Sequence, residues 1–233
     1  MIPLRDSNPT RTTPVLTYLI IALNVAVFLY QRSLDPESER LFVEQFGLIP
    51  TFLAHDPQLG SFITPLTSMF IHGSWLHIIF NMWSLYIFGD NVEDALGKGR
   101  FLLFYLVSGC AAAAGQVLVD PSSTLPMIGA SGAIAGVLAA YMRLFPNARV
   151  LTLIPLIVFF FVREIPAVFF IVFWFGLQVL SGISALHMPA TESGGVAVFA
   201  HIGGFLAGLL LIRSFVPSRN TTGGFRRPQP FRP

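Results

Sequence analysis

A serine and a histidine in two separate apolar segments are the residues of this chain best suited to do chemistry. Ser131 stands in Gly129-Ala130-Ser131-Gly132 at the start of one segment, and His201 lies inside another. A serine hydroxyl becomes a nucleophile when a nearby imidazole accepts its proton. If the fold brings the two segments together, the pair predicts a hydrolase whose site lies among apolar helices.

A second polar cluster occupies residues 72–81. His77 and Asn81 are four apart and share one helix face, while His72 stands at the mouth of that helix. An imidazole and an amide there could donate hydrogen bonds to an oxyanion that forms during attack on a carbonyl. The backbone N–H of Ser131 could join them, because the first N–H groups of a helix have no intrahelical acceptor.

The composition is that of a membrane protein. Hydrophobic residues make up 54% of the 233 positions and charged residues only 11%, which is too apolar for a water-soluble domain. A helix needs ~20 apolar residues to cross a bilayer. We predict an all-α, six-transmembrane-helix bundle with spans at 13–30, 75–89, 101–119, 131–145, 165–180 and 196–215. The expected organisation is a cytoplasmic N-terminus (1–12), one membrane domain (13–216) and a disordered cytoplasmic tail (217–233).

The apolar stretch 150–162 is shorter and contains Pro155. We interpret it as an interfacial piece, a re-entrant piece or a kinked extension of the fifth span. Counting it as a seventh span would put the termini on opposite sides of the membrane. With six spans and a cytoplasmic N-terminus, Arg32 and Arg40 are the only basic residues outside, in agreement with the positive-inside rule. The net charge of +2 therefore reflects orientation and not nucleic-acid binding.

The two candidate catalytic residues are also expected at similar depths in the membrane. At ~1.5 Å per residue, the span 131–145 covers ~22 Å of a ~30 Å hydrocarbon core. Ser131 is therefore expected several ångströms below the outer surface, beside a water-filled cavity. His201 lies at similar depth, and Gly204 and Gly208 continue a stripe of small residues that permits close helix contact.

Other intramembrane chemistries lack their residues. The chain has no His-Glu-x-x-His motif and no carboxylate within a predicted span, so no metal site is expected. An aspartyl mechanism needs two buried carboxylates, and Asp90 has no partner at similar depth. A small transporter would need buried charges or paired broken helices. Cys110 is the single cysteine and is interpreted as a packing residue.

With these residues in place, the chain resembles the rhomboid family of intramembrane serine proteases. The resemblance covers roughly residues 66–211 and rests on the following motifs: His72-x4-His77-x3-Asn81, Gly129-Ala130-Ser131-Gly132 and Ala200-His201-Ile202-Gly203-Gly204. It implies that Ser131 is the nucleophile and His201 the general base. It implies oxyanion-hole side chains at His72 and Asn81, with His77, Gly129 and Gly132 in supporting positions.

The resemblance also implies cleavage of transmembrane protein substrates near the outer membrane face, in the lipid bilayer and without a metal or other cofactor. Phe80, Phe170 and Trp174 could form a lateral substrate gate, with access from above beneath the loop 182–195 as the alternative. Two departures stand out: Phe62-Ile63-Thr64-Pro65 replaces the Trp-Arg pair of many rhomboids, and Ala135 replaces an aromatic that braces the histidine. Bracing is therefore expected to come from elsewhere, such as Phe199 or Phe205, or to be weaker.

A catalytically silent rhomboid-like protein that binds membrane segments is the alternative function. Such proteins typically lack the serine and histidine that this chain retains. The expected location is a prokaryotic cell (inner) membrane, with both termini cytoplasmic. No particular substrate and no oligomeric state is predicted.

Overall fold

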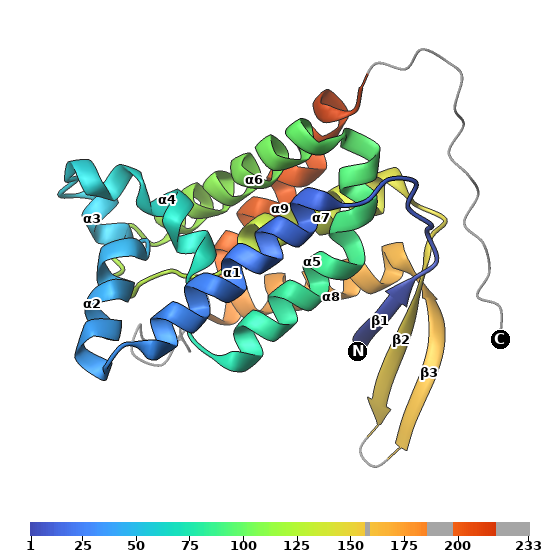
Figure 1. Ribbon diagram of the computed structural model, residues 1–233, viewed down its shortest axis with the longest axis horizontal. Coiled ribbons are helices and arrows are strands. Elements are labelled where there is room, and N and C mark those ends of the chain that lie inside the picture. The colour runs from blue at the N-terminus through green and yellow to red at the C-terminus, as the bar shows by residue number, and fades with distance from the viewer. Residues whose placement is uncertain (157–158, 186–197, 218–233) are drawn as a thin grey trace.

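The computed structural model describes residues 1–156, 159–185 and 198–217. The elements in chain order are β1 (Ile2–Asp6), α1 (Val15–Ser33), α2 (Pro36–Phe46), α3 (Pro50–Ala54), η1 (Leu59–Phe62), α4 (Thr64–Thr67), η2 (Ser68–Phe70), α5 (Trp75–Leu96), α6 (Lys98–Val119), α7 (Ser131–Leu144), β2 (Arg149–Leu156), β3 (Phe159–Pro166), α8 (Ala167–Ala185) and α9 (Val198–Phe215). The long helices form a bundle, with α2, α3 and α4 gathered at one end and the strands at the other (Figure 1).

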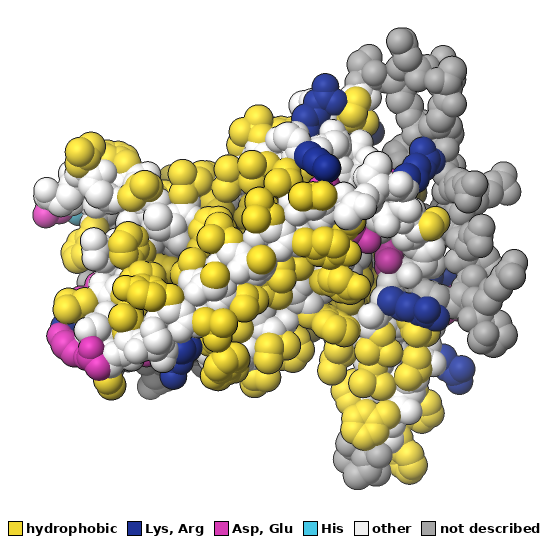
Figure 2. Space-filling model, viewed as in Figure 1, with side chains coloured by type: hydrophobic (Ala, Val, Ile, Leu, Met, Phe, Trp, Pro, Cys, Tyr) yellow, Lys and Arg dark blue, Asp and Glu magenta, His cyan; other side chains and the backbone are white. Residues whose placement is uncertain are grey.

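The surface of the bundle is that of a membrane protein. Among the described residues, α1, α6, α8 and α9 are long and apolar enough to cross a membrane, and α7 is a shorter apolar helix. Apolar side chains cover the middle of the face in Figure 2, whereas charged side chains gather toward its two ends. These observations confirm a mostly helical integral membrane protein.

Helix α7 is the centre of the bundle. Its residues from Gly132 to Tyr141 are all buried, and it packs against α5, α6, α8 and α9. Small residues allow this crowding: a Cβ on Gly132 would lie 2.5 Å from Cβ of Ala112 on α6, and one on Gly208 of α9 would overlap the backbone of Gly136. The predicted close contact through small residues is confirmed.

The described parts of the stretch 150–162, namely 150–156 and 159–162, are extended, which corrects the all-α prediction. β2 and β3 form an antiparallel hairpin, and β1 pairs antiparallel with the other edge of β2. The interpretation of this stretch as a kinked extension of the fifth span is therefore wrong. Pro155 cannot donate a helical hydrogen bond, and the Ile, Val and Phe residues that dominate the stretch favour strands.

The segment 1–12 contributes the strand β1, which the prediction of a plain polar N-terminus did not include. The hydroxyl of Tyr141 on α7 donates to a carboxylate oxygen of Asp6 at 2.5 Å, and the indole N–H of Trp83 on α5 donates to the carbonyl of Pro3 at 2.6 Å. Burial raises the pKa of Asp6 to about 6. These contacts fix the strand against the bundle.

A carboxylate from α5 sets the start of α1. The buried Glu93 accepts hydrogen bonds from the backbone N–H groups of Leu16 at 3.0 Å and Thr17 at 2.7 Å, and from the Thr17 hydroxyl at 2.8 Å. N–H groups in the first helical turn have no intrahelical acceptor, and a negative charge is favourable there. This bond network fixes α1 beside the helix that carries His77 and Asn81.

Two predicted features lie outside the described residues. The tail 217–233 is described only at Pro217, and most of the loop 182–195, from residue 186 on, is likewise outside them. The expectations of a disordered tail and of substrate access beneath that loop therefore stay predictions.

The contact between α7 and α9 yields a stability prediction. A methyl group in Gly208→Ala would overlap the backbone of Gly136, so the two helices must separate. We expect a loss of about 1–3 kcal/mol in unfolding free energy, measured by thermal unfolding in detergent.

Gly176→Ala on α8 is the matched control, because a Cβ there meets nothing within 4 Å. Alanine has the higher helix propensity, so this variant should be as stable as the wild type or slightly more stable. Equal melting temperatures for the two variants would contradict the packing argument.

Candidate active site

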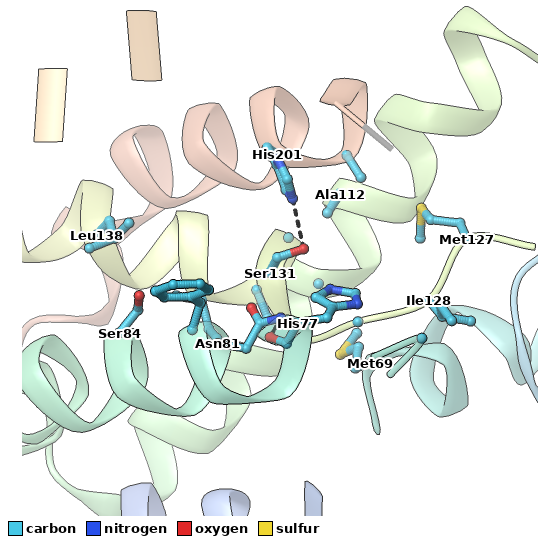
Figure 3. A pocket seen from close by; sticks show the side chains of 18 of the residues that line it. Met69, His77, Asn81, Ser84, Ala112, Met127, Ile128, Ser131, Leu138 and His201 are labelled. Atoms are coloured by element: carbon cyan, nitrogen blue, oxygen red, sulfur yellow. Dashed lines mark hydrogen bonds between the residues drawn. The ribbon is translucent and has the colours of Figure 1, made fainter. Parts of the chain in front are cut away.

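Ser131 and His201 meet at the contact between α7 and α9. Ser131 is the first residue of α7, and its Oγ lies 2.7 Å from Nε2 of His201 (Figure 3). The two helices approach closely beside this pair, where a Cβ on Gly204 would overlap the backbone carbonyl of Gly132. The glycines thus account for a hydroxyl and an imidazole meeting at hydrogen-bond distance.

The second ring nitrogen of His201 also has a partner. Nδ1 lies 2.7 Å from Oε1 of Gln178 on α8, and the ring of Trp174, one helical turn earlier, has its centroid 5.9 Å from the imidazole centroid. Phe199 and Phe205 were the expected sources of support for His201, with weaker support as the alternative. Phe205 instead stacks on Phe175 at 4.1 Å, and α8 provides the contacts to the imidazole.

Gln178 is a site residue that the sequence analysis missed. It is the single amide in the segment 167–185, where Ser181 and Ser184 are the other small polar residues. A polar side chain at membrane depth is costly unless it has a partner, which by default marks it as functional. That signal was present in the sequence, but it does not identify the partner.

His77 and Asn81 line the same cavity as the Ser131 and His201 pair. Both lie on α5, on the opposite side of Ser131 from His201 (Figure 3). His77 packs against Gly129, where a Cβ would lie 2.6 Å from Nε2 of the imidazole. Gly129 also has a φ of +118°, which glycine adopts without strain. The amide N–H of Asn81 donates to the carbonyl of His77 at 3.0 Å.

His72 does not reach the cavity, contrary to its predicted place in an oxyanion hole. Its side chain is fully buried and its ring contacts that of His77, with centroids 4.9 Å apart. Burial, and to a lesser degree the nearby His77, lowers the pKa of His72 to about 4. The residue at the helix mouth is thus buried away from the cavity, and His77 in the first turn of α5 takes its place beside Ser131.

The cavity has a volume of about 690 Å³. The predicted gate residues Phe80, Phe170 and Trp174 line it, from α5 on one side and α8 on the other. Pro3 of β1 lines it too, a contribution that the sequence analysis did not anticipate. Among the described residues, no group of three or more His, Cys, Asp or Glu side chains is placed to hold a metal ion.

Fold and site together define a helical membrane protein with a serine and a histidine paired at a cavity. The profile of the Rhomboid domain matches residues 59–218, and the chain belongs to this family. The chain is 29% identical over 200 residues to "Rhomboid protein 1, mitochondrial" of Saccharomyces cerevisiae. It is 32% identical over 129 residues to "Rhomboid protease GluP" of Bacillus subtilis and 29% identical over 142 residues to "Rhomboid protease AarA" of Providencia stuartii.

These alignments cover 84%, 55% and 54% of this chain, and 51%, 24% and 49% of the respective relatives. The chain thus spans about half of the length of two of these proteins and about a quarter of the third. Similar proteins are bacterial, mitochondrial and chloroplastic, so the expected prokaryotic membrane stays a prediction.

The segment before α5 yields a second stability prediction. Gln31 on α1 is buried; its side-chain N–H donates to the carbonyl of His72 at 3.0 Å, and its Oε1 accepts from the His72 backbone N–H at 3.4 Å. Gln31→Leu leaves both backbone groups unpaired. We expect a loss of about 1–3 kcal/mol per group in unfolding free energy, measured by thermal unfolding.

Gln45→Leu on α2 provides the control, because that amide is exposed. Its melting temperature should stay close to that of the wild type. If the Gln31→Leu protein is as stable as the Gln45→Leu protein, the hydrogen bonds between the Gln31 side chain and the His72 backbone do not stabilise the fold.

Proposed function

We propose that this protein is an intramembrane serine endopeptidase that cleaves transmembrane protein substrates with a Ser131/His201 dyad. The observation that carries the proposal is the 2.7 Å contact between the serine Oγ and the imidazole Nε2 at a cavity between membrane helices. Membership of the Rhomboid family and the presence of named rhomboid proteases among similar proteins support it.

In the first half of the reaction, Ser131 attacks the scissile carbonyl while His201 takes its proton. The carbonyl oxygen becomes an oxyanion, which needs hydrogen-bond donors arranged in advance. We assign this role to the side chains of His77 and Asn81 and to the backbone N–H of Ser131. His77 replaces His72 in the assignment because it lines the cavity and packs at the serine loop.

In the second half, His201 returns the proton to the leaving amine and water then hydrolyses the acyl-enzyme. The cavity of about 690 Å³ has room for a substrate segment and for this water. We propose that the substrate helix approaches laterally between α5 and α8, past Phe80, Phe170 and Trp174. Aromatic side chains from both helices line this path, and they would separate a substrate from the dyad until α8 moves.

The rival proposal is a catalytically silent rhomboid-like protein that binds membrane segments. It gives no reason for a serine hydroxyl to lie within hydrogen-bond distance of an imidazole at membrane depth. A polar pair at membrane depth costs free energy, so a function is the default explanation for its presence. The dyad geometry therefore favours the enzyme.

The proposed topology has six spans, formed by α1, α5, α6, α7, α8 and α9, with both termini in the cytoplasm. Its support is the distribution of basic residues, of which only Arg32 and Arg40 fall on the outer side. The N-terminal ends of α5, α7 and α9 then face outward, so the dyad lies nearer the outer surface.

The catalytic roles predict graded losses of activity. Ser131→Ala should abolish cleavage, since it removes the nucleophile, and His201→Ala should come close to doing so. Asn81→Ala and His77→Ala should each lower the rate about 10²-fold, or ~3 kcal/mol, because one oxyanion donor of several is lost. Cleavage of a transmembrane substrate in proteoliposomes measures the rates, with melting temperatures as the control for folding.

Labelling with a serine-directed fluorophosphonate separates the enzyme from the silent binder. The wild type should be labelled and Ser131→Ala should not. Absence of label on folded wild-type protein, together with absence of cleavage, would favour the binder and refute the protease.

The topology predicts which introduced cysteines are accessible from outside. In a Cys110→Ala background, Ser122→Cys before α7 should react with an impermeant thiol reagent on intact cells. Lys98→Cys, at the start of α6, should react only after permeabilisation. Both positions are exposed on the protein surface. Reaction of Lys98→Cys in intact cells would contradict the six-span orientation.

A further inference from the structure

We propose that Gln178 is the positioning residue for His201 and takes the place that a carboxylate holds in a catalytic triad. The inference rests on the proposed function, since it concerns the general base of that reaction. Its basis is the 2.7 Å contact between Gln178 Oε1 and Nδ1 of the imidazole, on the side of the ring opposite to the Ser131 contact.

This contact selects the tautomer that catalysis requires. An amide oxygen only accepts hydrogen bonds, so Nδ1 must carry the proton of the neutral imidazole. Nε2 is then unprotonated and can accept the proton of Ser131. The opposite tautomer would place an N–H against the serine hydroxyl, and the serine would have no base.

An amide suits this position better than a carboxylate because of where α8 lies. The segment 167–185 contains no Asp, Glu, Lys, Arg or His, and a charged side chain in a membrane helix is costly. The titratable group that faces His201 from α5 is His77. A neutral amide fixes the orientation of the imidazole without placing a formal charge among these apolar helices.

Gln178 is also placed to fix the orientation of the imidazole ring. Residues Phe170, Trp174 and Gln178 follow one another at intervals of four and so share one face of α8. Phe170 and Trp174 line the cavity, and the Trp174 ring packs near the imidazole. Two successive turns of α8 therefore fix the histidine, one by ring contact and one by hydrogen bond.

Three variants test the inference in proteoliposomes. Gln178→Leu removes the acceptor with little change in size, and Gln178→Glu restores an acceptor oxygen. Gln116→Leu on α6 is the control; it removes an amide whose Oε1 is buried without a hydrogen-bond partner among the described residues. We expect Gln178→Leu to lower kcat and the rate of fluorophosphonate labelling about tenfold or more, with KM nearly unchanged. Gln178→Glu should recover most of the loss, and Gln116→Leu should keep kcat close to that of the wild type.

The inference is wrong if Gln178→Leu keeps kcat within about twofold of the wild type, or if a Gln178→Glu protein with the melting temperature of the wild type is as impaired as Gln178→Leu. A spectrum of the wild-type protein with ¹⁵N-labelled histidine adds a test that needs no stable variant. It should show His201 protonated at Nδ1, and protonation at Nε2 would overturn the assignment. Loss of the proposed function itself looks different, because the wild type would then fail to label at Ser131.

Discussion

Backbone contact between α7 and its neighbours is the constraint on which the site depends. Lipid offers no hydrophobic driving force between helices, so their association requires close packing. Gly132 and Gly136 permit it on α7, and Gly204 and Gly208 permit it on α9. The same glycines that make the bundle stable place a helix start beside a histidine, and stability and site geometry therefore share one cause.

Buried polar groups in the bundle form hydrogen bonds that join one helix to the next segment. Glu93 of α5 accepts the first N–H groups of α1, and Gln31 of α1 holds the backbone on both sides of His72. Each pairing satisfies buried groups that would otherwise cost free energy. Together they fix α5 and the segment before it, and His77 and Asn81 of α5 line the cavity with Ser131.

The sequence predicted the helices and the central pair well, because both leave local signals. Apolar runs mark the spans, and a polar residue inside an apolar run marks a site, as with His201. The errors concern properties that only tertiary contact decides. His72 and His77 are both imidazoles near one helix start, and the packing of His77 against Gly129 determines which one lines the cavity. The strands β2 and β3 were missed because a short apolar run is compatible with either helix or strand.

Helix α8 carries residues for two parts of the proposed mechanism, the lateral gate and the positioning of the base. Phe170 and Trp174 line the cavity from it, while Oε1 of Gln178 lies 2.7 Å from Nδ1 of His201 and is the acceptor that we propose for the imidazole proton. Any displacement of α8 that widens the cavity therefore also moves the acceptor of that proton. A protease built this way would have an impaired base while its gate is open and a competent one when α8 returns over the bound substrate. Such coupling would limit cleavage of membrane segments that enter the site only briefly.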